Sequence, residues 1–334
     1  VVTARLVTQK KITPKVTSQA SSVKESKSVS TSSQSSSTVT QSKDTSTVAI
    51  ESETVPQSST PAIPKTVVLK PEASGVLAFS GGSASIDASN VSEGYVMVKY
   101  EGSSTKVKLQ ITGADSVIYT YSLNPSNNYE TFPLTCGSGS YKVNVYENIQ
   151  GTQYALALGE TLDVQLSDSL KPYLYPNQYV NFNANSKTVA KGAELALGAK
   201  NDLEIVQNVY NYVIKNISYD DNKAQTVKSG YLPAVDSILA NKKGICFDYA
   251  AVMATMLRTQ NIPTKLEVGY ASGNIYHAWI SVHLKDIGWV NNIIYFDGSD
   301  WKLMDPTFAS NANSSDSIMK FIGNGSNYST KYVY

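Results

Sequence analysis

The chain of 334 residues carries a formal net charge of +1, and only 16% of its residues are charged. This balance excludes the strong positive field that would point to nucleic acid or to an anionic membrane surface. No run of about 18 apolar residues occurs, so we expect no membrane span. The first residue is Val, so we expect a trimmed chain whose signal peptide has been removed, and an extracellular or cell-surface protein rich in Tyr, Ser, Thr and Asn.

The first 70 residues contain no Phe, Trp or Tyr, and more than half of residues 18–60 are Ser or Thr. Such a segment buries too little apolar surface to offset the conformational entropy lost on folding. We therefore expect residues 1–70 to be a disordered linker. A spacer between an anchor and the folded part is the simplest interpretation, and a carbohydrate-modified stalk is the alternative.

Residues 74–166 alternate between apolar and polar positions in short runs that turn residues separate. The runs cover residues 94–100, 106–111, 116–121 and 140–146. A period of two is typical of strands with one buried face, and short strands at this spacing predict a β-sandwich domain. We expect a rigid spacer or substrate-presenting module, with ligand binding through its Tyr residues as the alternative.

Residues 167–334 change to helical patterns followed by strand patterns. The helical patterns cover residues 187–199, 202–216 and 233–239, and a further helix runs from Cys246 to about Gln260. The strand patterns cover residues 264–270, 276–284 and a hairpin over 293–304. Helices followed by an antiparallel sheet predict an α+β domain.

The stretch Gly244-Ile245-Cys246-Phe247-Asp248-Tyr249-Ala250-Ala251 begins the last of these helices. Gly244 ends the preceding segment and permits an unusual backbone conformation. The apolar positions 250, 253, 254 and 257 share one helical face, which places Cys246 in the first turn of a buried helix. The unpaired N–H groups and positive dipole of that turn favour a thiolate, and the same N–H groups can hold an oxyanion.

A thiolate nucleophile needs a base and a residue that orients the base. His277 begins the strand-like run His277-Ala278-Trp279-Ile280, and Asp305 follows another such run. The order Cys, His, Asp therefore predicts a triad in which Asp305 accepts the Nδ1–H of His277. Because 28 residues separate His277 from Asp305, Asp297 and Asp300 remain alternatives for the orienting carboxylate.

Four motifs follow one another between about residues 200 and 308: Gly-x-Cys-x-Asp-Tyr-Ala, Gly269-Tyr270, His-Ala-Trp and Asp-Pro-Thr. As an ordered set they resemble the transglutaminase-like superfamily, and its bacterial secreted members in particular, which have a papain-like core. The resemblance implies a catalytic domain in which Cys246 is the nucleophile, His277 the base and Asp305 the residue that orients His277.

We therefore expect an exported cysteine hydrolase or acyltransferase that acts on amide bonds through a thioester. Water as acceptor gives a peptidase or amidase, which we favour because nothing in the sequence marks an amine site or a calcium loop. An amine as acceptor gives a cross-linking transglutaminase. The expected substrate of this monomer is a protein or peptide, with cell-wall peptide as one candidate. The alternative is a non-catalytic cell-surface binding module with the same fold.

The remaining Cys and His residues give no sign of a cofactor or a metal. Cys136 and Cys246 fall in different expected domains, so we expect two free thiols, with Cys136 a small residue at a strand end. His277 and His283 would lie roughly 20 Å apart at about 3.3 Å per residue along one strand. That separation is too large for one ion with ligands at about 2 Å, and we expect His283 to be exposed.

Several residues near Cys246 have expected supporting roles. Asp248 complements the positive end of the helix dipole, and we expect its carboxylate to point away from the sulfur. Trp279 and Tyr249 pack the core. We expect three tyrosines to line the cleft: Tyr231, Tyr270 and Tyr276. The sequence identifies no side-chain donor for the oxyanion.

Overall fold

The computed structural model describes residues 66–271, 275–296, 301–303 and 329–334. The described residues all belong to one compact unit, which spans residues 61–334. The segment expected to be disordered, residues 1–70, lies outside the described residues except at its end. There the Val67 N–H donates to the Thr259 carbonyl oxygen at 2.8 Å, which attaches the chain to the helical part that follows.

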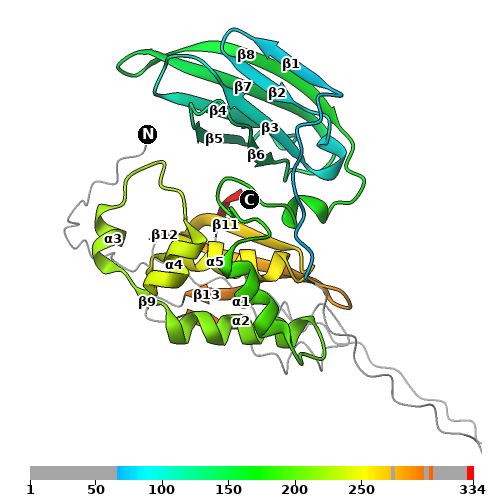
Figure 1. Ribbon diagram of the computed structural model, residues 1–334, viewed down its shortest axis with the longest axis vertical. Coiled ribbons are helices and arrows are strands. Elements are labelled where there is room, and N and C mark those ends of the chain that lie inside the picture. The colour runs from blue at the N-terminus through cyan, green and yellow to red at the C-terminus, as the bar shows by residue number, and fades with distance from the viewer. Residues whose placement is uncertain (1–65, 272–274, 297–300, 304–328) are drawn as a thin grey trace, which may run out of the picture. The chain divides into compact units, whose positions relative to one another are not determined.

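Two four-stranded antiparallel sheets come first along the described chain (Figure 1). The order β1-β2-β3-β6 joins Ala78–Gly81, Ala84–Asp87, Tyr95–Tyr100 and Glu130–Pro133. The order β5-β4-β7-β8 joins Ile118–Leu123, Val107–Thr112, Gly139–Gln150 and Gln153–Val164. Short 3-10 helices, η1 at Val91–Glu93 and η2 at Lys171–Tyr173, lie before β3 and after β8.

The alternating sequence pattern determines the core of these sheets. Along β4, Val107, Leu109 and Ile111 are buried, while the intervening residues are only half-buried. Tyr119 and Tyr121 are buried in the same alternating way along β5. Buried side chains from both sheets belong to one continuous apolar core, which is the two-layer arrangement that the alternation predicts.

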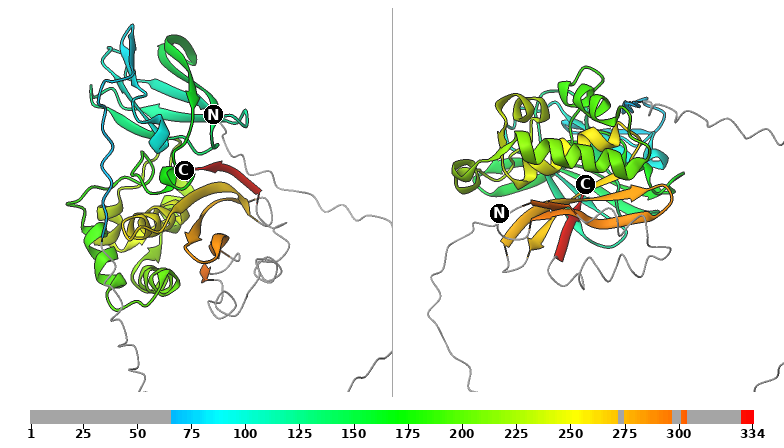
Figure 2. Two further views of the ribbon diagram at one scale, coloured as in Figure 1. Left: turned by 90° about the vertical axis from the view of Figure 1, so that its right-hand side faces the viewer. Right: turned by 90° about the horizontal axis from the view of Figure 1, so that it is seen from below.

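Helices and a five-stranded antiparallel sheet make up the rest, with the helices on one face of that sheet (Figures 1 and 2). The helices are α1 (Lys187–Ala196), α2 (Asp202–Asn216), α3 (Asp221–Thr226), α4 (Val235–Asn241) and α5 (Cys246–Arg258). The sheet order is β14-β13-β12-β11-β15, with β11 at Thr264–Ala271, β12 at Ile275–Leu284, β13 at Gly288–Phe296, β14 at Trp301–Leu303 and β15 at Ser329–Val333. A separate parallel pair joins β9 (Ser218–Tyr219) and β10 (Lys243–Gly244).

The helix that carries Cys246 is the central element of this part. Every residue of α5 from Asp248 to Arg258 is buried, whereas the sequence pattern predicted burial of one face only. The difference arises because α1, α2, α4, β11 and β12 all pack against α5. The approach of α1 is close enough that a Cβ on Gly192 would meet the Met256 Cα at 2.9 Å. Full burial contributes about 1.5–3 kcal/mol for each large apolar side chain.

Arg258 fixes the far end of α5. Its guanidinium is buried and donates to the carbonyl oxygens of Thr264, Tyr175 and Tyr334 at 2.7–3.0 Å. Burial lowers the pKa of Arg258 to about 9, so the group stays charged at neutral pH. Among the helices that the structure describes, none combines the length and the apolar character needed to cross a bilayer.

The expected α+β order is observed, with differences in the bounds and number of elements. The short helix expected over 233–239 begins later, at Val235, because Pro233 and Ala234 precede its first turn. The strand β15, which pairs with β11 on the side away from β12, was not expected. The hairpin turn expected at 297–300 lies outside the described residues.

Candidate active site

Cys246 is the first residue of α5, as the sequence predicts. Ile245 before it is extended, with φ −100° and ψ 176°, and caps the helix. Gly244 is needed because Asp248 lies too close for a side chain at this position. The expectation that Gly244 adopts an unusual backbone conformation is therefore corrected. A Cβ at this position would meet the Asp248 Cβ at 2.7 Å, so a larger residue would push the start of the helix away.

The Cys246 thiol is not a stabilised thiolate in this structure. Burial is the largest effect and raises the pKa of Cys246. The backbone N–H groups of Ala278 and Phe247 lie near the sulfur and oppose the shift, but they do not reverse it. The expectation that the helix start would lower the thiol pKa is therefore wrong for this conformation, because desolvation outweighs the dipole.

His277 lies on β12, the strand against which the start of α5 packs. The imidazole is only 5% exposed, and burial lowers the pKa of His277 to about 4. Ala278, whose N–H reaches the Cys246 sulfur, is its direct neighbour. The structure thus brings the thiol to the strand position that carries the imidazole, with both groups neutral near pH 7.

Asp305 lies outside the described residues, and so do the alternatives Asp297 and Asp300. The last described residue before Asp305 is Leu303, at the end of β14. In the sheet order, β13 separates β14 from β12.

Asp248 forms a buried ion pair just inside the helix start. Its carboxylate is fully buried and accepts the Ile245 N–H at 2.9 Å, the Tyr231 hydroxyl at 2.6 Å and the Lys223 ammonium at 2.5 Å. The N–H contact confirms the expected role at the helix N-terminus. Lys223, on α3, was not foreseen, and it supplies the positive charge that makes a buried carboxylate tolerable beside a nucleophile. Tyr231 contacts this carboxylate with its hydroxyl.

Tyr219 is the second residue near Cys246 that sequence reasoning missed. Burial raises the pKa of this phenol to about 12, and the backbone N–H of Cys246, which lies near the phenol oxygen, opposes the shift. Tyr219 pairs with Gly244 in the parallel β9–β10 bridge, which holds the phenol beside the helix start. The run Ile217-Ser218-Tyr219 directly after α2 was the available signal.

A model of the transglutaminase-like superfamily matches residues 190–292, a stretch that contains both Cys246 and His277. These residues form a transglutaminase-like domain. The match ends before Asp305.

The chain is similar to several known proteins. The UPF0252 protein MJ1282 of Methanocaldococcus jannaschii is 24% identical over 217 residues, which are 62% of this chain and 54% of that protein. The chain thus spans about half the length of this curated relative. A structure described as a candidate cysteine protease from Cytophaga hutchinsonii matches 77% of this chain and 78% of its own, with 14% identity and a TM-score of 0.35. The periplasmic domain of TgpA from Pseudomonas aeruginosa matches 66% and 75%, with 17% identity and a TM-score of 0.29.

Aromatic side chains surround the start of α5 in the transglutaminase-like domain. Tyr276 is 57% exposed, and its ring meets that of Tyr270 at 5.5 Å between centroids. Phe247, next to Cys246, meets the ring of Tyr179 at 5.3 Å. Trp279 is fully buried and packs the core, as expected.

The remaining His and Cys residues lie apart from this site. His283 is half-buried against the ring of Trp289, not exposed as expected, because the two residues face each other across β12 and β13. Cys136 and Cys246 are both free thiols, as expected. Within the described part of the chain, no group of three or more His, Cys, Asp or Glu is placed to hold a metal ion.

Proposed function

We propose that the transglutaminase-like domain acts on amide bonds, with Cys246 as nucleophile and His277 as base. The observation that supports this proposal is the packing of α5, which begins at Cys246, against the strand β12, which carries His277. His277 takes the thiol proton while the sulfur adds to the carbonyl carbon. The tetrahedral intermediate then expels the amine, which takes the proton from His277, and a thioester remains.

The protonation states of Cys246 and His277 favour a mechanism in which the thiol proton passes to the imidazole during the attack. They do not favour a thiolate–imidazolium pair that exists before the substrate binds. Burial raises the pKa of Cys246 and lowers that of His277, so each group is neutral at rest. A neutral imidazole is the form that accepts a proton. Accordingly, iodoacetamide should label Cys246 slowly below pH 7 without substrate, and Cys136, whose pKa burial raises to about 11, should also label slowly.

We further propose that Tyr219 completes the oxyanion site. Tyr219 pairs with Gly244, two residues before Cys246, and the Cys246 N–H lies near the phenol oxygen. A substrate oxyanion between these two groups would receive the N–H and the phenol O–H together. Tyr219→Phe should therefore lower kcat more than it changes KM, by roughly tenfold or more for one lost donor.

Asp305 completes the proposed triad by accepting a hydrogen bond from the Nδ1–H of His277. A carboxylate that accepts a hydrogen bond from an imidazole raises the pKa of that imidazole and so opposes the effect of burial. We expect Asp305→Asn to lower both the His277 pKa, followed by NMR titration, and the turnover. Asp297→Asn and Asp300→Asn are the matched controls, and an unchanged His277 titration in Asp305→Asn would remove Asp305 from the site.

The same thioester can react further in two ways. Hydrolysis would make the protein a peptidase or amidase, and transfer to an amine would make it a cross-linking transglutaminase. We propose hydrolysis of a protein or peptide substrate at the cell surface, which the Ser- and Thr-rich segment over 18–60 supports as a spacer. Release of ammonia or of a new amino terminus, measured with and without an added primary amine, separates the two reactions.

Cys246→Ser against Cys136→Ser is the direct test of the enzyme proposal. We expect the first substitution to abolish turnover of a peptide library and the second to leave it unchanged. Turnover that survives Cys246→Ser would refute the proposal. The second candidate function, a binding module without catalysis, is favoured by the raised thiol pKa, and it predicts substrate capture that alkylation of Cys246 does not affect.

A further inference from the structure

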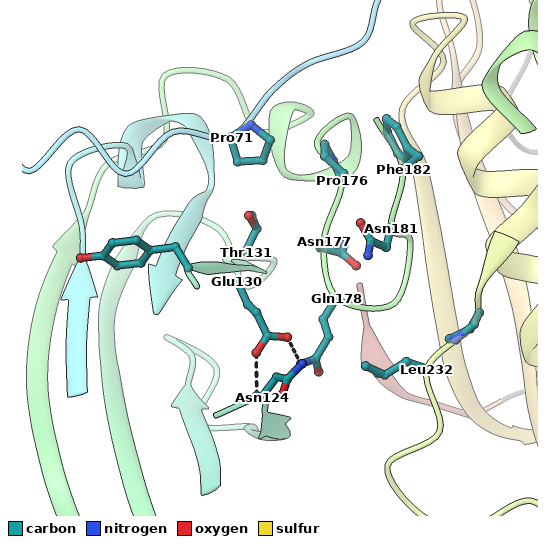
Figure 3. Close-up of a pocket in the computed structure, with 12 residues that line it drawn as sticks. Pro71, Asn124, Glu130, Thr131, Pro176, Asn177, Gln178, Asn181, Phe182 and Leu232 are labelled. Atoms are coloured by element: carbon teal, nitrogen blue, oxygen red, sulfur yellow. Dashed lines mark hydrogen bonds between the residues drawn. The ribbon is translucent and has the colours of Figure 1, made fainter. Parts of the chain in front are cut away.

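A pocket separate from the thiol lies beside the loop that follows η2 (Figure 3). Its volume is about 340 Å³, within the range of small-molecule sites. Its walls combine apolar residues with amides, and the most informative members are Glu130, Asn177, Gln178, Asn181 and Leu232. No Lys or Arg is among the lining residues that the structure describes, and Glu130 is acidic, so the pocket does not suit an anion.

The Gln178 amide has a fixed orientation. Its nitrogen donates to the Ser122 carbonyl oxygen at 2.7 Å and to the Glu130 carboxylate at 2.9 Å. Because both partners accept only, the nitrogen must occupy this side, and the oxygen Oε1 must face the other. Oε1 has no hydrogen-bond partner among the described residues, although Gln178 is only 7% exposed.

The Asn177 amide also has a fixed orientation, but here the oxygen and not the nitrogen is hydrogen-bonded. Its oxygen accepts the N–H groups of Tyr179 and Val180, each at 3.0 Å, so the nitrogen Nδ2 is the atom left over. Asn177 is 4% exposed, and in the described part of the chain Nδ2 also finds no partner. Neighbouring residues thus hold one unsatisfied donor and one unsatisfied acceptor in the wall of one pocket.

Leaving such atoms unpaired costs about 1–3 kcal/mol each, which a ligand with the matching groups would recover. A secondary amide carries both matching groups, a C=O that accepts and an N–H that donates, on opposite edges of its plane, so that Nδ2 and Oε1 flank the amide when it binds. Both protein atoms are covered in this conformation, so the ligand must displace a wall side chain. Leu232, which is 38% exposed, is the wall residue with open space beside it.

Two contacts connect this pocket to the start of α5. Tyr179, which follows Gln178, packs its ring on Phe247, the residue after Cys246. Tyr231, which precedes Leu232, donates to Asp248 at 2.6 Å. Two of the segments that line the pocket, those that contain Gln178 and Leu232, are therefore attached to residues next to the candidate nucleophile.

We propose that this pocket binds a secondary amide of a neutral ligand, through Asn177 Nδ2 and Gln178 Oε1, as a subsite for the substrate of Cys246. The amide can come from a peptide bond or from an N-acetylated sugar, which share this chemistry. The assignment as a substrate subsite rests on the proposed function, whereas binding of the amide does not.

The test uses the full chain with Cys246→Ser, so that no turnover occurs, and saturation-transfer NMR. The probes are N-acetylalanine methylamide for a peptide, N-acetylglucosamine for a sugar, and glucose as the sugar without an amide. We expect saturable binding of at least one amide probe and none of glucose. The probe that binds more tightly identifies the source of the amide.

Asn177→Asp is the decisive variant, because an aspartate keeps the oxygen that accepts the two N–H groups and replaces only the donor Nδ2. We expect at least a roughly tenfold loss of amide affinity. Asn185→Asp, an exposed change of the same kind in the next turn, should leave the affinity unchanged. If Asn177→Asp does not fold, Leu232→Trp, which fills the pocket from its exposed side, should abolish binding.

Absence of binding by both amide probes, or binding that these variants leave unchanged, would overturn the proposal. Amide binding together with a Cys246→Ser protein that retains turnover would refute the enzyme proposal and leave the pocket assignment standing. Turnover that requires Cys246, together with no binding of either amide probe, would overturn the pocket assignment and leave the enzyme proposal standing.

Discussion

Removal of the Lys223 side chain should destabilise the protein, because it leaves the buried carboxylate of Asp248 without its positively charged partner. Asp248 is fully buried, and its ion pair with Lys223 has a 2.5 Å N–O distance. Breaking a buried pair from one side typically costs about 3–5 kcal/mol. Because the Lys223 side chain is 26% exposed, water can reach its position, and we expect roughly 2–3 kcal/mol for Lys223→Met.

The measurement is urea unfolding of Lys223→Met, with Lys228→Met as a control at an exposed position of the same segment. A loss of this size should lower the Tm by about 5–10 °C in a chain of this length. Adding Asp248→Asn removes the uncompensated charge while keeping an acceptor for the Ile245 N–H, so the double variant should recover more than half of the loss. A cost for Lys223→Met no larger than for Lys228→Met would refute the reasoning.

The same substitution should also reduce the reactivity of Cys246. Without Lys223, the carboxylate two residues away acts on the thiol uncompensated and raises its pKa further. One uncompensated neighbouring charge typically shifts a pKa by about one unit or more, so we expect a shift on the order of one pKa unit. The pH dependence of alkylation should shift upward accordingly, and the double variant should reverse the shift.

Three further predictions concern the scaffold of the site. Burial lowers the pKa of His277 to about 4 in the folded protein, so the unfolded chain protonates this residue at a higher pH than the folded protein does. The contribution of neutral His277 to the free energy of unfolding should therefore be complete above about pH 6.5 and fall by at most about 3 kcal/mol as the pH drops toward 4. Urea titrations at several pH values measure this fall, and His277→Gln should flatten it. Arg258→Met leaves three buried carbonyl oxygens without their donor and should cost about 3 kcal/mol or more in the same assay. A Cβ on Gly269 would meet the Ser329 carbonyl oxygen at 2.0 Å, so Gly269→Ala should detach β15 and expose it to limited proteolysis; unchanged protection would contradict this.

The start of α5 could be predicted from sequence because its signals are local. Cys246 follows a glycine and precedes a helical run, and α2 was predicted at its observed residues because Asn201 caps it and its apolar residues repeat at helical spacing. The expected sandwich rested in the same way on alternation within single strands. Asp305 stays a prediction, since it lies outside the described residues.

What the sequence did not reveal depends on contacts between distant residues. Tyr219 reaches Cys246 through a two-residue parallel bridge that leaves almost no pattern. The strand β15 pairs with β11 more than sixty residues away in the chain, and its five residues show no strong alternation of burial. The raised thiol pKa follows from packing around the helix start, and no local pattern reports that balance between burial and dipole.

The complete burial of α5 has a consequence for which parts of this domain tolerate substitution. The helix touches neighbours along its whole length, so a sequence change there disturbs the nucleophile and the fold together. Residues 224–230, in contrast, are all exposed, and the segment is held to the helix start through Lys223 and Tyr231. A deep mutational scan should therefore find α5 nearly intolerant of substitution and this segment permissive.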